Sequence, residues 1–340
     1  MRIAPLRVAM LAPISWRTPP RHYGPWELVT SLLTEALVAR GVDVTLFATL
    51  DSLTAGKLAG VVPAPYSEDP SLDAKVWEAL HVAHLFEHAG EFDLIHNQAD
   101  FIPLVFSRLV KTPMVTTIHG FSSERIVPAF KMYEERVSYV AISDADRHSD
   151  LRYAATIHHG IPIEDFPLDP AGSEDLLFFG RIHPHKGASE AVQVARQSGR
   201  RLVIAGILQD EPYFRERVEP AIDGDKVVYL GPVGGAQRTR TLGAAQALLH
   251  LIRFDEPFGL SVIEAMACGT PVIAFNRGAM PELIDDGVTG FLVETVEEAV
   301  AAVARIGEID RAACRAAVAA RFTVEAMADR YLQLYRTLVG

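Results

Sequence analysis

Residues 6–12, 27–41 and 43–48 read LRVAMLA, ELVTSLLTEALVARG and DVTLFA, and this stretch decides the fold. The first and third segments are apolar on both faces, which is typical of strands buried inside a parallel sheet. In the second segment the leucines and alanines recur at helical spacing, and Gly41 stands where a helix would end. A strand, a helix and a second buried strand in succession predict an α/β unit whose sheet is covered by helices on both faces.

The same alternation continues along the chain. Further strands are predicted at Asp93–His96, Met114–Ile118 and Tyr139–Ile142 and, in the second half, at Leu176–Gly180, Arg201–Gly206, Val227–Leu230, Ala247–Leu251, Pro271–Ala274 and Gly290–Val293. The clearest helical runs of the second half are Ala188–Gln197, Gly259–Cys268 and Val296–Ile306. Three prolines within residues 162–170 mark a linker between the halves. We therefore expect two doubly wound α/β domains that face one another across a cleft, with ligands at the carboxyl ends of the strands.

The length and composition of the chain agree with two globular domains, and its net charge argues against one class of partner. The 340 residues include 49% hydrophobic and 22% charged residues, and 32 basic against 43 acidic residues give a net charge of −11. A negative sum argues against a nucleic-acid partner, although it leaves room for a local anion site. Cys268 and Cys314 are too few for a disulfide framework and lack metal-ligand spacing, so we expect a reducing, cytosolic setting.

The first apolar run, Val8–Ile14, is too short to span a membrane and lacks the features of a signal peptide, so it is interpreted as a buried strand. No other segment approaches 18 consecutive apolar residues. The sequence therefore predicts no transmembrane segment, while peripheral membrane contact stays open.

A first cationic motif follows the opening strand of the second half. Neither opening strand is followed by a Gly-x-Gly-x-x-Gly loop, and no Walker-type loop is present. Instead, residues 180–187 read GRIHPHKG and carry Arg181 and Lys186 on a turn between a strand and a helix. A planar guanidinium and a point-charge ammonium suit a diphosphate. Two ordinary surface cations on a loop are the alternative interpretation.

A second motif carries two carboxylates. Residues 255–271 read DEPFGLSVIEAMACGTP, in which seven residues separate Glu256 from Glu264. A helix is predicted to begin near Gly259, and its free N–H groups would attract an anion. Glu264 lies in apolar surroundings one to two turns into that helix, where it could accept hydrogen bonds from a ribose diol. The alternative is a capping or solvated glutamate, although a buried carboxylate needs partners.

This run resembles the Glu-seven-residues-Glu signature of retaining glycosyltransferases of family 4, which have the GT-B fold. Other segments that are similar to the family follow in the same order over nearly the whole chain: Pro19–Glu27, Thr117–Gly120, Ala141–Ser143, His159–Pro162 and Arg277–Glu282. Each segment is weak alone, but their order and spacing together are specific.

The resemblance implies a role for each matching residue. Arg181 and Lys186 would neutralise the diphosphate of a nucleotide-sugar donor, and Glu256 would bind the sugar hydroxyls. Glu264 would hold the ribose, and His119 would sit by the transferred sugar. Phe258, Gly259 and Leu260 would supply backbone contacts near the phosphates and the sugar. The base would lie near Gly206 and the turn that contains Val233.

The resemblance also implies the reaction and the domain plan. A sugar would pass with retention from a UDP- or GDP-sugar to a hydroxyl of a small molecule, glycan or lipid, with no metal or other cofactor. Residues 1–165 would bind the acceptor and residues 166–322 the donor, with a helix at about 323–340 packing back on the first domain. A GT-B epimerase or hydrolase of nucleotide-sugars and a non-catalytic nucleotide-sugar-binding protein remain alternatives. Two-carboxylate glycosidase chemistry is disfavoured, because Glu256 and Glu264 are better used on donor hydroxyls.

One loop departs from the family pattern. Where the family carries a Gly-Gly pair, this sequence has Gly24 followed by Pro25, which lacks a backbone donor. Tyr23, Gly24 and Trp26 are therefore predicted to belong to an acceptor or diphosphate loop, with Trp26 shaping the acceptor pocket.

Two other signals are interpreted as structural. His81, His84 and His88 share a helix face that we expect to be solvated or partly buried rather than metal-binding, and the run Arg238–Arg240 is interpreted as a helix surface.

Overall fold

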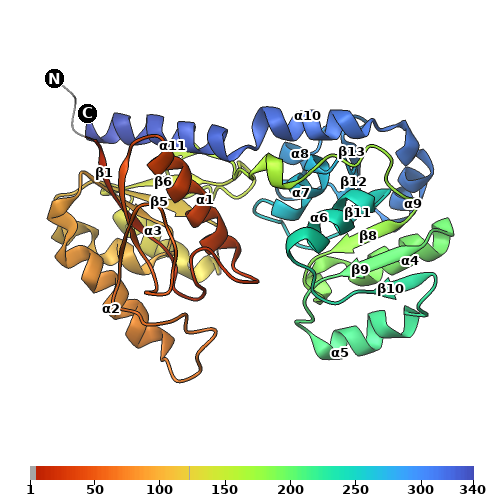
Figure 1. Ribbon diagram of the computed structural model, residues 1–340, viewed down its shortest axis with the longest axis horizontal. Coiled ribbons are helices and arrows are strands. Elements are labelled where there is room, and N and C mark those ends of the chain that lie inside the picture. Colours follow the sequence, from red (N-terminus) through yellow and green to blue (C-terminus); the bar gives the residue numbers. More distant parts are fainter. Residues whose placement is uncertain (1–4, 122) are drawn as a thin grey trace. The chain divides into compact units, whose positions relative to one another are not determined.

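The computed structural model describes residues 5–121 and 123–340, which form two compact units (Figure 1). Unit 1 comprises Met1–Gly160 and Val324–Gly340, and unit 2 comprises Ile161–Thr323. The first division thus falls after residue 160, where the sequence analysis placed it after residue 165. In the described part of the chain, no helix combines the length and the apolar character that crossing a membrane requires.

The sheet of unit 1 is entirely parallel, with the strand order β3-β2-β1-β4-β5-β6-β7. Its strands are β1 (Arg7–Leu11), β2 (Asp43–Phe47), β3 (Lys57–Ala59), β4 (Leu94–Asn97), β5 (Met114–Ile118), β6 (Val137–Ala141) and β7 (Tyr153–Thr156). The five strands predicted in this half are confirmed. Strands β3 and β7 were not predicted, because they are short edge strands without a continuous apolar run.

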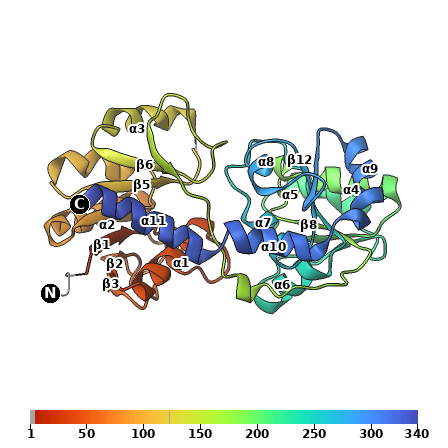
Figure 2. The same ribbon diagram turned by 90° about the horizontal axis from the view of Figure 1, so that it is seen from above.

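Helices cover both faces of this sheet (Figures 1 and 2). They are α1 (Pro25–Ala39), α2 (Ala74–Glu87), α3 (Val127–Tyr133), α11 (Val324–Val339) and the 3-10 helix η2 (Ile102–Leu109). Helix α1 packs beside α11, whereas α2, η2 and α3 share a core with alternate side chains of β1, β4, β5 and β6. Helix α1 starts with Pro25, whose missing N–H costs nothing at a first helical position.

The C-terminal helix α11 belongs to unit 1 through buried polar contacts. The Tyr335 hydroxyl lies 2.6 Å from Nδ1 of His96, and the Tyr331 hydroxyl lies 2.7 Å from Oγ1 of Thr117. Both tyrosines are almost fully buried, and Asp329 accepts a hydrogen bond from Arg40 of unit 1. These contacts tie the end of the chain to the strands that carry the candidate site described below.

Unit 2 repeats the design with the order β10-β9-β8-β11-β12-β13, again all parallel. The strands are β8 (Leu176–Phe179), β9 (Leu202–Ala205), β10 (Val227–Tyr229), β11 (Ala247–His250), β12 (Val272–Phe275) and β13 (Gly290–Val293). The helices are α4 (Ala188–Ser198), α5 (Glu211–Tyr213), α6 (Gly235–Ala244), α7 (Leu260–Ala267), α8 (Met280–Leu283), α9 (Val296–Arg305) and α10 (Arg311–Arg321). Helix α4 packs on α9, and α7 contacts both α6 and α10.

Both sheets have a point at which the strand order reverses. It lies between β1 and β4 in unit 1 and between β8 and β11 in unit 2. Loops that leave the carboxyl ends of such neighbouring strands diverge to opposite faces of the sheet, which opens a crevice suited to a ligand. A ligand site is therefore expected in each unit among the residues that follow these strands.

Candidate active site

In unit 2, the loops after β8 and β11 bring together two residues predicted from separate motifs. Nζ of Lys186 lies 2.6 Å from Oε2 of Glu256, and each side chain is only 16% exposed. The same ammonium stands 4.7 Å from the centre of the Phe254 ring. A half-buried ammonium can exchange its carboxylate partner for another anion, so the pair marks a place where a phosphate could bind.

The residues that follow β8, β9 and β10 lie along the same edge of the sheet. Gly206 donates its N–H to the carbonyl of Gly231 at 2.9 Å, and a Cβ on Gly206 would stand 1.7 Å from the carbonyl oxygen of Gly180. Only glycine fits there. Arg181 donates to Oε1 of Gln209 at 2.7 Å, and Val233 is half-buried just before α6. The predicted base and diphosphate residues are thus neighbours along the strand ends.

The segment predicted to contact the phosphates forms the start of helix α7. Phe258 is buried, Gly259 is the N-cap residue with φ 112°, and Leu260 begins the helix. Among the described residues no side chain caps this end, and the start of a helix attracts an anion. The helix start predicted near Gly259 is confirmed.

Glu264 is buried within α7 and is paired with Arg238. Its side chain is 2% exposed, and both carboxylate oxygens contact one guanidinium nitrogen of Arg238. Burial raises the pKa of Glu264, although the charge of Arg238 acts in the opposite direction. The carboxylate therefore has the partner that its burial requires.

The run Arg238–Arg240 lies on helix α6 as predicted and Arg240 is exposed, but Arg238 is more than a surface residue. Helix α6 packs on α7, so the Arg238 side chain is 30% exposed and lies 5.7 Å from the centre of the Phe179 ring. Its Nε atom is buried and has no hydrogen-bond partner among the residues that the structure describes. A short polar helix carries no periodic apolar stripe, so no sequence signal identified the buried face.

In unit 1, His119 follows β5 and is held by three neighbours. Its ring is stacked between Trp26 and His159, with centroids 5.2 Å away on each side, and its Nε2 lies 2.6 Å from Oε1 of Gln98. Because an amide oxygen can only accept, Nε2 carries the proton and Nδ1 is a bare acceptor. Burial lowers the pKa of His119 to about 3, so the ring is neutral at physiological pH.

A hydrogen-bonded chain connects His119 to the C-terminal helix. Gln98 links His119 to His96, whose Nε2 lies 3.2 Å from the Gln98 amide nitrogen, and His96 in turn contacts Tyr335 of α11. Neither Gln98 nor His96 was predicted as a site residue, because both stand at the end of β4 without a motif around them.

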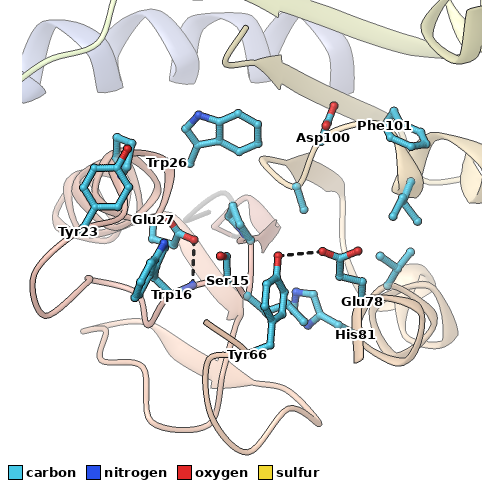
Figure 3. Close-up of a pocket in the computed structure, with 16 residues that line it drawn as sticks. Ser15, Trp16, Tyr23, Trp26, Glu27, Tyr66, Glu78, His81, Asp100 and Phe101 are labelled. Atoms are coloured by element: carbon cyan, nitrogen blue, oxygen red, sulfur yellow. Dashed lines mark hydrogen bonds between the residues drawn. The ribbon is translucent and has the colours of Figure 1, made fainter. Parts of the chain in front are cut away.

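The loops after β1 and β4, together with α1 and α2, line an open pocket of about 440 Å³ within unit 1 (Figure 3). It occupies the point where the strand order of this sheet reverses. Tyr23 and Trp26, which were predicted for an acceptor or diphosphate loop, line it. The other lining residues are Pro13, Ile14, Ser15, Trp16, Pro25, Glu27, Tyr66, Glu78, His81, Val82, Ala99, Asp100, Phe101 and Ile102.

Glu27 is a buried carboxyl at this pocket, which the sequence analysis did not single out. It is 3% exposed, and its Oε1 accepts a hydrogen bond of 3.1 Å from the Trp16 N–H. Gly24 caps α1, and a Cβ there would stand 2.8 Å from Oε2 of Glu27, so the glycine makes room for the carboxyl. Burial raises the pKa of Glu27 to about 7.

The pKa of Glu27 makes a testable contribution to stability. A carboxyl whose pKa is raised on folding from 4.5 stabilises the folded state at low pH, and this contribution is lost as the pH rises toward 7. Between about pH 5 and about pH 7, the free energy of unfolding should therefore fall by about 2 kcal/mol more in the parent than in Glu27→Gln. Denaturant titrations at both pH values measure this difference, and parallel profiles would contradict it.

The predicted histidine face is divided in the structure. His81 is almost fully buried rather than solvated or partly buried, and its Nε2 lies 2.9 Å from the carbonyl oxygen of Ala12. His84, Glu87 and His88 form a separate cluster, whose potential ligand atoms all lie within 4.8 Å of one another. None of these three residues lines the pocket.

Comparison with protein families covers most of the chain. A model described as glycosyltransferase family 4 matches residues 27–167, and a model described as glycosyl transferases group 1 matches residues 163–320. A D-inositol 3-phosphate glycosyltransferase of Saccharomonospora viridis is 29% identical over 88% of this chain and 86% of that protein. A protein of the same name from Mycolicibacterium smegmatis is 35% identical over 47% of this chain and 40% of its own length.

Solved structures show the same architecture. AviGT4, a glycosyltransferase involved in avilamycin A biosynthesis, is 25% identical and superposes with a TM-score of 0.72 over 98% of each chain. A sucrose-phosphate synthase of Thermosynechococcus elongatus is 22% identical with a TM-score of 0.78, over 98% of this chain and 99% of that one. The protein has the α/β GT-B fold and is a glycosyltransferase. It belongs to glycosyltransferase family 4.

Proposed function

We propose that the enzyme moves a sugar, with retention of anomeric configuration, from a UDP- or GDP-sugar to a hydroxyl group of a small molecule, glycan or lipid. The observation that carries this proposal is the half-buried pair of Lys186 and Glu256. When a diphosphate binds, the Lys186 ammonium would turn to the phosphate oxygens. Glu256 would then be released to accept hydrogen bonds from the sugar hydroxyls. Arg181 would supply the second cation.

The remaining donor contacts follow from the elements around this pair. Backbone N–H groups at the start of α7, around Phe258, Gly259 and Leu260, would face the phosphates. Glu264, oriented by Arg238, would accept from the ribose hydroxyls, and the base would lie by Gly206 and Val233. With two cations and a helix N-terminus on the diphosphate, the proposal requires no metal ion.

The chemical step is proposed by analogy with the family. The bond between the anomeric carbon and the diphosphate oxygen breaks first, and the acceptor hydroxyl then adds from the same face. The acceptor's proton passes to the departing phosphate oxygen. Fixed cations that face the developing negative charge supply the main catalytic effect. His119, neutral and with a bare Nδ1, would accept a hydrogen bond from a hydroxyl of the transferred sugar.

Two other functions remain as competing proposals. A GT-B epimerase or hydrolase would turn over the donor at full rate without any acceptor, and a non-catalytic sensor would bind the donor without turnover. Anabaena HepE, 19–20% identical, has been solved in complex with UDP, with UDP and glucose, and with UDP-glucose. UDP-glucose is therefore the first donor to test. We further propose that the reaction takes place in the cytosol.

A thermal-shift screen of UDP-, GDP- and ADP-sugars, with and without a metal chelator, tests the donor. A ligand at one hundred times its dissociation constant adds about 2.7 kcal/mol of stability, which gives a clear shift. The anomeric proton coupling of the transferred sugar in the product, read by NMR, tests retention. Absence of any shift with every donor would contradict the proposal, and a shift that needs a divalent ion would contradict its metal independence.

A further inference from the structure

The carboxylates around the two candidate sites differ in what neutralises them. In unit 2 each has a cationic partner: Glu190 with Arg253, Glu256 with Lys186, and Glu264 with Arg238. The carboxylates of the unit 1 pocket have no such partner. Among the described residues, no lysine, arginine or histidine forms an ion pair with Glu27, Glu78 or Asp100.

These three carboxylates reach the pocket from three different elements (Figure 3). Glu27 comes from α1, Glu78 from α2, and Asp100 from the loop after β4. Two of them are held by hydrogen bonds, since Glu27 accepts from the Trp16 N–H and Glu78 accepts from the Tyr66 hydroxyl at 3.0 Å. Asp100 has φ 58°, a strained conformation for a residue other than glycine and one that clusters at ligand sites.

The walls of the pocket are aromatic, and the lining carries no lysine or arginine within the described chain. The aromatic residues are Trp16, Tyr23, Trp26, Tyr66 and Phe101. Faces of such rings attract cations and stack on the apolar faces of sugar-like rings. Trp26 also stacks on His119, which connects the pocket wall to the residue proposed to contact the transferred sugar.

A buried imidazole nitrogen supplies an independent sign of a ligand. His81 lines the pocket and is 1% exposed, and its Nδ1 has no hydrogen-bond partner among the residues that the structure describes. Because Nε2 donates to the Ala12 carbonyl, Nδ1 is an acceptor without a donor. Burial lowers the pKa of His81 to about 4, so the ring adds no positive charge to the pocket at neutral pH.

We propose that this pocket is the acceptor site and that it takes a sugar-like ring bearing an ammonium group, such as an amino sugar or an aminocyclitol. The ammonium would complete the charge of Glu27, Glu78 and Asp100, while the ring stacks on the aromatic walls. A phosphorylated acceptor would meet three carboxylates and no cation. The relatives named for D-inositol 3-phosphate would thus differ from this enzyme in acceptor charge. The inference rests on the proposed function only in calling the ligand the acceptor.

Tryptophan fluorescence gives a direct measurement, because Trp16 and Trp26 are two of the three tryptophans in the chain. The full chain is titrated with glucosamine, glucose and inositol 3-phosphate at neutral pH. We expect glucosamine to quench with a dissociation constant at least about tenfold below that of glucose, and inositol 3-phosphate to have little effect. Equal or tighter binding of glucose or of the phosphate, or no response to glucosamine, would overturn the proposal.

Matched variants test whether the pocket carboxylates cause the preference for glucosamine over glucose. Asp100→Asn retains a residue type that tolerates positive φ, and Glu78→Gln retains an acceptor for the Tyr66 hydroxyl. Each should weaken glucosamine about tenfold and leave glucose unchanged. Glu87→Gln, on the same helix as Glu78 but exposed and outside the pocket, should change neither. Unaltered selectivity in both pocket variants would contradict the proposal.

The donor screen separates the two proposals. Glucosamine binding without any nucleotide-sugar binding would refute the proposed transfer and leave the ammonium site standing. Binding of a nucleotide-sugar, together with a preference for glucose or inositol 3-phosphate in the fluorescence titration, would refute the ammonium site and leave the proposed sugar transfer standing.

Discussion

Lys186→Ala is expected to lower kcat/KM for sugar transfer by a factor of about a hundred to a thousand. The substitution removes a fixed ammonium from the position proposed for the leaving diphosphate, and one such donor is worth about 3–4 kcal/mol at the transition state. It also leaves the Glu256 carboxylate, 16% exposed, without its cation, so that this charge would repel the phosphates. Steady-state kinetics with the donor found in the screen, together with calorimetric titration of the nucleoside diphosphate, measures both effects.

Two further variants are needed to interpret the effect of Lys186→Ala: a control and a double variant that also removes the Glu256 charge. Lys226→Ala removes an exposed lysine of the same unit and should leave the kinetics unchanged. In Lys186→Ala combined with Glu256→Gln, the repelling charge is gone, so nucleoside diphosphate affinity should partly recover while transfer stays impaired. A loss smaller than tenfold in Lys186→Ala would contradict the role assigned to the ammonium.

The fold could be predicted closely because its signals are local. Strands such as β1 and β11 are buried on both faces, which produces short, continuous apolar runs between helical patterns. The two missed strands show the limit of this reasoning. Strand β3 is mostly exposed at the sheet edge and contains Lys57, so it has neither an apolar run nor a clear alternation.

The candidate site could be predicted only where a motif carried it. Lys186 and Glu256 lie in two recognisable stretches, and the structure brings them into contact. Arg238, Gln98 and Asp100 could not be found in the same way, because their importance lies in contacts with residues distant in sequence or in one unusual backbone angle. Charge pairing of buried groups is a property of the folded chain, and spacing along the sequence does not encode it.

The net charge of the sequence excludes some classes of partner but gives no information about the charge of each site, because the pairing of charges arises only in the folded chain. An excess of eleven negative charges argues against polyanions as partners. It does not reveal that Glu190, Glu256 and Glu264 of unit 2 are paired with cations, whereas the carboxylates of the unit 1 pocket form no ion pair among the described residues. That contrast, visible only in the structure, is the basis on which we propose a diphosphate site in unit 2 and an ammonium site in unit 1.

Arg238→Met is expected to lower the free energy of unfolding by about 4 kcal/mol, because it leaves the carboxylate of Glu264 buried without a counter-charge. Adding Glu264→Gln removes the stranded charge and should restore most of the stability, which a double-mutant cycle in denaturant unfolding measures. Arg240→Met, at an exposed position on the same helix, is the matched control and should cost little. If Glu264 binds the donor ribose, the stable double variant should still have weakened nucleotide affinity. Recovery of stability with unchanged affinity would confine the pair to a structural role, and additive costs in the cycle would contradict the pairing itself.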